Sequence, residues 1–236
     1  ATAILLKHLN LETGIQRYRI ATALVRLRSN NPRLVPDRAR VLEHLENELQ
    51  GAYRSLATQA DLNSEPALAP LVAALDDRLM YQRRRIFKLL GLIHDPQTIQ
   101  TIARNLESPD GSVADNAVEV IDDLADPAIR RALVNLVDRS PVEAKLANLE
   151  KTHENTRRSS QERLQELLLD DDAFVVACAV HLLGLRKGGG EIVEFVPLLS
   201  HRSAIVREAA AQSMYRKHGQ SSLEWIRPLM DDPSSE

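Results

Sequence analysis

The sequence has few of the residues that disulfide frameworks, β-sheets and membrane spans require. One cysteine in 236 residues excludes a disulfide within the chain, and aromatic residues make up only 3%. Glycine occurs 9 times, and no apolar run approaches the roughly 20 residues that cross a bilayer. The net charge of −3 gives no general attraction to nucleic acid or acidic lipid. These absences favour an all-α protein with a core of leucine, alanine, valine and isoleucine.

A pattern in the segment Phe174 to Leu185 returns along the chain at an interval of 31 residues. Two side chains spaced by four residues recur in this register, as Val113 and Ala117, Val175 and Ala179, and Val206 and Ala210. The run Leu182-Leu183-Gly184-Leu185 matches Leu89-Leu90-Gly91-Leu92, which lies three intervals earlier. A sustained period of this length indicates stacked helical units, none of which buries its apolar face alone.

Helical spacing of apolar residues, interrupted by proline, aspartate and serine, predicts where the helices lie. The expected helices cover about 15–28, 38–60, 67–93, 164–169, 173–186, 192–199, 204–217 and 223–230. The two long ones predict an antiparallel pair that interrupts the regular spacing within residues 1–93. Residues 94–236 are expected to form regular repeats, with a degenerate unit near 140–163 and a turn at Gly188-Gly189-Gly190.

We interpret residues 1–236 as one continuous helical array. The last six residues, 231–236, resemble the turn that precedes a further repeat. An array that ends on such a turn, with no polar capping helix, is typical of a piece of a longer array. We therefore expect this chain to be a fragment of a longer protein.

The segment Val206-Arg207-Glu208-Ala209-Ala210 opens the second helix of a predicted pair, and it resembles the HEAT repeat family. The short repeats look most like the HEAT-like units of phycobilisome lyases and bacterial scaffolds. Arg17 occupies the motif's arginine position, whereas Val176 and Ala114 replace it elsewhere. The resemblance implies an all-α fold, a right-handed HEAT-like α-solenoid of antiparallel helix pairs.

Three segments, at 14–27, 31–49 and 75–92, carry a narrower resemblance. Their order is similar to the soluble HEAT region attached to bacterial transporters of the ATP/ADP-translocase type, which belong to the major-facilitator class. This resemblance implies a cytoplasmic regulatory module, joined to a membrane only through a transporter domain outside the chain. No transport residue is implied, because none of the matching segments is a transport segment.

The candidate binding residues form a basic cluster on the two long helices. We predict that a partner is bound by Arg38, Arg40, Tyr81, Arg83, Arg84, Arg85 and Lys88. Arginine planes can grip a phosphate, an acidic lipid or a carboxylate-rich protein. A solvated helix face paired with Glu43, Glu46, Glu48 or Asp77 would give the same pattern. Among the uses of such a cluster, the slightly acidic chain favours a protein partner over nucleic acid.

No other residue pattern points to chemistry. The histidines lack metal-binding spacing, and only His44 has a carboxylate one turn later, at Glu48. Cys178 and His181 are expected to be structural residues of an apolar helix. Paired aspartates such as Asp76-Asp77 are expected to cap helices. We therefore predict no catalytic residue, no metal and no cofactor.

The sequence predicts a non-catalytic scaffold that holds a protein partner, or a neighbouring domain of its own chain, on the face formed by the second helix of each pair. The alternative is an enzyme or nucleic-acid-binding protein on a HEAT scaffold, similar to a phycobilin lyase or a DNA glycosylase. A glycosylase needs a strongly basic groove with aromatic side chains. One tryptophan and a pI of about 6.2 argue against this alternative.

Overall fold

The computed structural model describes residues 2–11, 14–31, 33, 34, 36–147, 157–187 and 190–232. These residues form helices and connecting turns with no β-strand, so the prediction of an all-α protein is confirmed. None of the described helices is both long enough and apolar enough to cross a membrane. The α-helices are α1 (Thr2–Leu11), α2 (Gly14–Asn30), α3 (Arg38–Leu62), α4 (Ala69–Ile93), α5 (Pro96–Leu106), α6 (Gly111–Leu124), α7 (Arg130–Val137), α8 (Val142–Ala147), α9 (Ser160–Leu167), α10 (Ala173–Leu185), α11 (Ile192–Phe195), α12 (Ala204–His218) and α13 (Leu223–Ile226).

Short 3₁₀ turns form part of three of the expected helical segments, and a fourth turn, η3, connects α12 to α13. They are η1 (Pro66–Leu68), η2 (Val196–Ser200), η3 (Gly219–Ser222) and η4 (Arg227–Asp231). The predicted long pair is present as α3 and α4, each of 25 residues. Parts of three expectations lie outside the described residues: the degenerate unit at 148–156, the turn at 188 and 189, and the lead-in to a further repeat at 233–236.

Aspartate side chains cap the N-termini of several helices, as their positions in the sequence predict. Asp95, Asp110 and Asp172 accept backbone N–H bonds at 2.8, 2.9 and 3.0 Å from the first turns of α5, α6 and α10. Such bonds satisfy donors that the helix itself leaves unpaired. The expectation is wrong for Asp76, which lies inside α4 and accepts a bond of 2.6 Å from Gln59.

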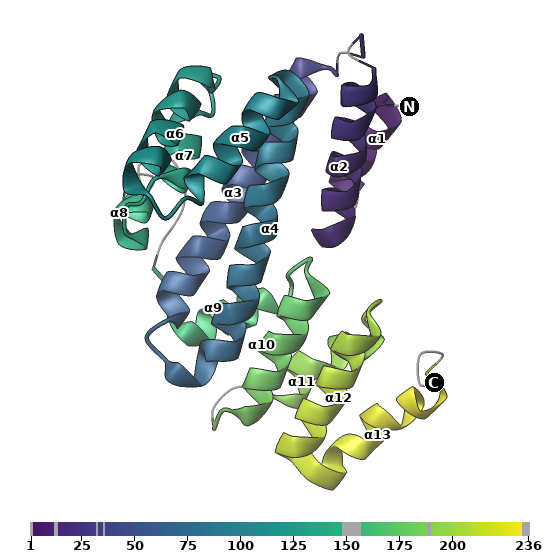
Figure 1. Cartoon of the computed structure of the whole chain (residues 1–236). Helices are drawn as coiled ribbons and strands as arrows, with labels where there is room; N and C mark the ends of the chain where they lie inside the picture. The colour runs from purple at the N-terminus through teal and green to yellow at the C-terminus, as the bar shows by residue number, and fades with distance from the viewer. Residues whose placement is uncertain are drawn as a thin grey trace. The chain divides into compact units, whose positions relative to one another are not determined.

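The chain divides into two compact units (Figure 1). Unit 1 comprises residues 1–60 and 76–156, and unit 2 comprises residues 61–75 and 157–236. Helices α3 and α4 therefore contribute residues to both units. Each unit has its own apolar core, and the interpretation of residues 1–236 as one array stays a prediction.

The core of unit 2 repeats with the interval seen in the sequence. Helices α10 and α12 pack against each other (Figure 1), and equivalent positions of the two helices are buried. These positions are at most 1% exposed: Val175 and Val206, Ala179 and Ala210, and Leu183 and Met214. A Cβ atom added at Gly184 would lie 2.5 Å from the Cβ of Ser213, so the two helices approach closely there. The periodic pattern thus predicted the inner faces of both helices.

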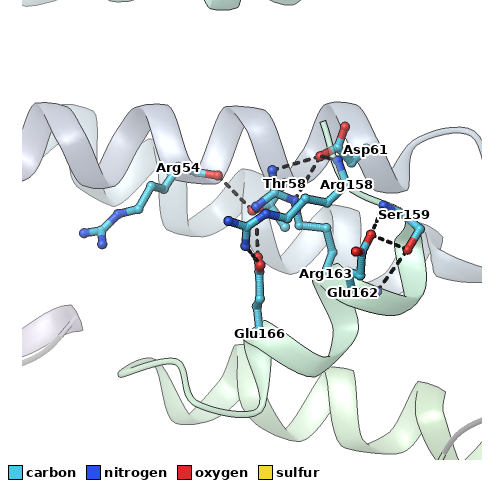
Figure 2. A network of polar contacts seen from close by, with 8 residues as sticks. All are labelled: Arg54, Thr58, Asp61, Arg158, Ser159, Glu162, Arg163 and Glu166. Carbon is cyan, nitrogen blue, oxygen red and sulfur yellow. Dashed lines mark hydrogen bonds and ion pairs between the residues drawn. The ribbon is translucent and has the colours of Figure 1, made fainter. Parts of the chain in front are cut away.

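Ion pairs within unit 2 fix α9 against the end of α3 (Figure 2). Arg163 is 9% exposed, and its Nε and Nη2 lie 2.9 and 2.8 Å from Asp61 Oδ2. Its Nη1 donates to Glu166 at 2.9 Å. Ser159 and Glu162 form a reciprocal cap at the start of α9. Because Arg163 has carboxylates on both sides, it is a structural cation of this unit.

Candidate functional site

Arg85, the centre of the predicted basic cluster, lies inside unit 1. It is 4% exposed, and its Nε and Nη2 donate to the two carboxylate oxygens of Glu48 at 2.9 and 2.8 Å. Its Nη1 also donates to the carbonyl oxygen of Gly14 at 3.3 Å. A buried bidentate pair of this kind uses the planar guanidinium fully. Arg85 is therefore not part of an exposed surface.

The neighbouring residues of α4 are divided between the interior and the surface. Arg83 is half-buried and donates to the Leu136 carbonyl oxygen at 3.3 Å. The Tyr81 ring meets the ring of Tyr18 edge to face, with 5.9 Å between the centroids. Arg84 is exposed, and its guanidinium carbon lies 5.8 Å from the Tyr81 centroid. Lys88 is half-buried.

The two predicted arginines at the start of α3 are both exposed and both paired. Arg38 Nη2 lies 3.1 Å from Asp126 Oδ2, and Arg40 Nε lies 3.6 Å from Asp37 Oδ2. Exposed pairs of this kind contribute little stability, about 0–1 kcal/mol. The structure thus brings Tyr81 and Arg84 together, whereas it places Arg85 inside and pairs Arg38 and Arg40 with carboxylates. The role of the cluster in partner binding stays a prediction.

A second polar cluster is buried in unit 1 around Tyr53. The Tyr53 hydroxyl donates to the Ala132 carbonyl oxygen at 2.8 Å and accepts from Asn135 Nδ2 at 3.1 Å. Lys145 is 4% exposed, and its Nζ donates to the carbonyl oxygens of Leu136 and Asp138 at 2.9 and 2.7 Å. These are the last carbonyls of α7, so the ammonium caps this helix end. Its donors are occupied, so Lys145 is a structural cation and not a free amine.

An open groove of about 530 Å³ lies beside this cluster on α6 and α7. It is lined by Asp122, Pro127, Arg130, Arg131, Val134, Asn135 and Asp138. The lining carries two carboxylates and two guanidinium groups, so it favours neither an anion nor a cation. Among the side chains that the structure describes, no three His, Cys, Asp or Glu residues could together hold a metal ion.

Tyr53 provides a pH test of the buried cluster. Burial raises the pKa of Tyr53 to about 12, although the bond from Asn135 acts in the opposite direction. The folded state therefore keeps the phenol proton at pH values where the unfolded chain, with a pKa of about 10, has lost it. We expect the contribution of Tyr53 to the free energy of unfolding to fall as pH rises above about 10, by about 2 kcal/mol at pH 12. Urea unfolding across this range checks it, and Tyr53→Phe should remove this pH dependence.

Helix α10 carries a mostly apolar outer stripe. Phe174, Cys178, His181 and Leu185 are spaced by four, three and four residues, which places them on one helical face. Phe174 is 54% exposed and Leu185 is 55% exposed, while the opposite face of α10 lies in the core. Apart from His181 and Gly184, every residue of α10 is apolar. A helix of this composition is ordinarily buried on all sides.

Helix α12 carries the corresponding stripe one interval later. It consists of Ile205, Ala209, Gln212 and Arg216, and Ile205 is 45% exposed. Because α10 and α12 bury the same positions in one core, Phe174, Leu185 and Ile205 face away from that core, whereas Cys178 and Ala209 are half-buried and pack against it. We call these eight residues the α10–α12 face: Phe174, Cys178, His181, Leu185, Ile205, Ala209, Gln212 and Arg216.

At the equivalent positions of α6, the exposed side chains are polar. They are Ser112, Asn116, Glu119 and Asp123, all of them exposed and polar. Helix α6 also buries Ala117 and Ile121, at the positions where α10 buries Ala179 and Leu183. The two helices therefore share an inner face and differ on the outer one. The apolar outer stripe is a specific property of unit 2.

Met230, another exposed apolar residue of unit 2, has a packing explanation. Met230 in η4 is 80% exposed, although Leu199, one interval earlier, is only 8% exposed. The residues of η2 are covered by α12, which packs on them. Met230 and its neighbour Leu229 therefore lie where stacking of one unit on the next buries a side chain. They are stacking positions, whereas Phe174, Leu185 and Ile205 are exposed on both of the helices that carry the α10–α12 face.

The groups on the α10–α12 face fit contact better than covalent chemistry. Burial is the larger cause that raises the pKa of the Cys178 thiol, and the charge of Asp172 acts in the same direction. A thiol with a raised pKa stays protonated at neutral pH, so it is a weak nucleophile. Sequence reasoning assigned Cys178 and His181 to the structure of an apolar helix. In the sequence, this face could have been found from Phe174 and Leu185, which share one side of the helix, away from the side of Val175 and Ala179.

No protein-family model matches the chain, and no curated protein matches it either.

Proposed function

We propose that this protein is a non-catalytic protein–protein interaction scaffold that holds its partner on the α10–α12 face. The observation that carries the proposal is the exposure of three apolar side chains, Phe174, Leu185 and Ile205, at outer positions of α10 and α12. Contiguous exposed apolar surface marks sites where another molecule is bound. The same positions of α6 carry polar residues. The apolar residues of the α10–α12 face are therefore not a general feature of the repeat.

The proposed architecture is a right-handed HEAT-like solenoid, with the partner on the face lined by second helices. Two observations support it: the repeated burial of equivalent positions in α10 and α12, and the contacts of the motif arginine. Arg207 Nε and Nη2 lie 2.5 and 2.6 Å from the Asp232 carboxylate, and Nη1 donates to the His201 carbonyl oxygen at 2.8 Å. In this proposal Arg207 links the turn before α12 to the residue that follows η4.

The narrower part of the proposal is the setting of the scaffold. The three segments at 14–27, 31–49 and 75–92 support a regulatory module of a bacterial transporter of the ATP/ADP-translocase type. The partner would then be a cytoplasmic protein or a neighbouring domain of the same polypeptide. This part rests on the sequence resemblance alone.

The proposal predicts that charge on the α10–α12 face abolishes partner capture and leaves the fold intact. Phe174 and Ile205 both lie in the first turn of their helices, where aspartate is favourable, so Phe174→Asp with Ile205→Asp should fold normally. Burying an apolar side chain contributes about 1.5–3 kcal/mol, so losing two should weaken binding by about a hundredfold or more. The measurement is quantitative pull-down from lysate of the source cells.

The matched control adds two negative charges to the exposed outer positions of α6, as Ser112→Asp with Asn116→Asp. This variant should capture the same partners as the unaltered chain, because these positions lie outside the face. Thermal unfolding of both variants should match that of the unaltered chain. Equal capture by the Phe174 and Ile205 variant would contradict the proposal.

A further inference from the structure

The open groove on α6 and α7 is lined by charges whose placement does not stabilise either helix. Asp122 lies in the last turn of α6, and Arg130 and Arg131 are the first two residues of α7. The helix dipole favours carboxylates at an N-terminus and cations at a C-terminus, so all three charges oppose it. All three side chains are exposed, so burial does not explain them either. Their placement costs stability, and binding of a ligand would account for it.

The carboxylates of the groove differ in how far they are already occupied. Asp138 accepts hydrogen bonds from the backbone nitrogen and the hydroxyl of Ser140, both at 3.0 Å. Asp122 has no hydrogen bond or ion pair in the part of the chain that the structure describes. On the other side, Arg130 Nε and Nη2 donate to the Ala125 carbonyl oxygen at 3.3 and 3.2 Å, which holds this guanidinium at the turn between the helices. The carboxylate that remains for a ligand is therefore that of Asp122.

The rest of the lining is less polar and is held in place. Pro127 and Val134 are its apolar side chains. Asn135 is 6% exposed, and its Nδ2 donates to the Tyr53 hydroxyl at 3.1 Å and to the Lys145 carbonyl oxygen at 2.8 Å. The groove volume of about 530 Å³ lies within the range of small-molecule sites, about 300–1,000 Å³. The groove is thus formed before any ligand enters.

We propose that this groove binds a short peptide with free termini, whose carboxylate meets Arg130 and Arg131 and whose ammonium meets Asp122. A simple anion would also face Asp122, and a simple cation would also face two guanidinium groups. A zwitterion gives each of these charges a partner, and hydrogen bonds between charged groups are the strong ones.

The packing of α6 on α7 sets the length of the peptide. The axes of packed helices lie about 8–10 Å apart, so a ligand that crosses from one to the other spans about this distance. About three extended residues, at about 3.3 Å each, cover it. In a free α-amino acid the two charges are too close together to do so. The inference goes beyond the proposed scaffold function and does not rest on it, because the groove belongs to unit 1 and the α10–α12 face to unit 2.

The probe is tri-alanine with free termini, titrated into the intact chain and followed by isothermal titration calorimetry. We expect saturable binding that weakens at least tenfold when the peptide is acetylated at its N-terminus, and at least tenfold when it is amidated at its C-terminus. Each cap removes one of the two charges that the groove would pair. Absence of saturable binding up to about 10 mM tri-alanine would overturn the proposal. Acetate that binds as tightly as tri-alanine would also overturn it, and would make the groove a simple anion site.

The variants Arg131→Gln and Asp122→Asn locate the binding. Each should weaken the binding of tri-alanine at least tenfold. The matched controls are Arg104→Gln and Asp115→Asn, which remove the same charges from exposed positions of α5 and α6 outside the groove lining and should leave binding unchanged. Because the two site variants each remove a charge that opposes a helix dipole, their midpoints of thermal unfolding should not fall. Unchanged binding in the site variants, or a clear loss of their thermal stability, would contradict the assignment.

Failure of this inference can be separated from failure of the scaffold proposal. The variant with Phe174→Asp and Ile205→Asp should bind tri-alanine as the unaltered chain does. If this variant keeps its captured partner, the scaffold proposal fails and the groove is unaffected. If tri-alanine does not bind to the unaltered chain, the groove proposal fails and the scaffold stands.

Discussion

Replacing Arg85 with methionine is expected to lower the free energy of unfolding of unit 1 by about 3 kcal/mol. The substitution leaves Glu48, which is 8% exposed, as a buried charge without its bidentate partner. Removing one member of a buried pair costs about 3–5 kcal/mol. Arg17 Nη1 lies 3.9 Å from Glu48 Oε1 and still compensates part of the charge, so we expect the lower end of this range.

Urea unfolding followed by circular dichroism measures this loss, because the only tryptophan, Trp225, lies in unit 2 and does not report on unit 1. The adjacent variant Arg84→Met is the control, since Arg84 is exposed and its loss should change stability by less than about 0.5 kcal/mol. The double variant Glu48→Met with Arg85→Met should regain most of the loss, because apolar residues often replace a buried ion pair without cost. Equal losses for Arg84→Met and Arg85→Met would contradict the assignment.

The contrast between Arg84 and Arg85 shows what the sequence could and could not predict. Charges at helical spacing look the same whether a neighbouring helix covers them or water does. The repeat held a clue, because Arg85 and Leu92 are equivalent to Cys178 and Leu185. Yet equivalence predicts only that these positions share a face, and the packing of α2 and α3 decides whether that face is exposed.

Features that depend on residues close in sequence were predicted well. Helix boundaries follow from apolar spacing and from caps such as Asp95 and Asp172, which act within one turn. The buried positions of α10 and α12 follow from the 31-residue period, because each repeat packs on its neighbour in the same way. Periodicity is therefore a sound guide to the inner face of a repeat.

Contacts between distant segments could not be predicted in this way. Tyr53 and Asn135 are 82 residues apart and belong to different helix pairs, so no local pattern connects them. Their contact depends on how α7 packs on α3 in unit 1. His44, which the sequence singled out only by the carboxylate of Glu48 one turn later, is 7% exposed, and burial lowers its pKa. The same limit applies to the α10–α12 face, whose exposure depends on what the rest of the protein leaves uncovered.

Replacing Phe195 with alanine is expected to cost unit 2 about 3–5 kcal/mol, the usual penalty for removing a fully buried phenylalanine. Phe195 is 0% exposed, and Leu164, one interval earlier, is also 0% exposed. Leu164→Ala should therefore destabilise the unit by about 2–5 kcal/mol. Ile226 lies one interval later and is only half-buried. Because fewer neighbours surround it, Ile226→Ala should cost less than about 2 kcal/mol.

These three substitutions test the repeat register directly, because they change the same position in three successive repeats of unit 2. Urea unfolding followed by circular dichroism gives the three losses on a common scale. The register predicts large losses at Leu164 and Phe195, where the next helix covers the side chain, and a small one at Ile226. If Ile226→Ala proved as damaging as Phe195→Ala, residue 226 would be packed as an inner position. The repeat register assigned to unit 2 would then be wrong at this position.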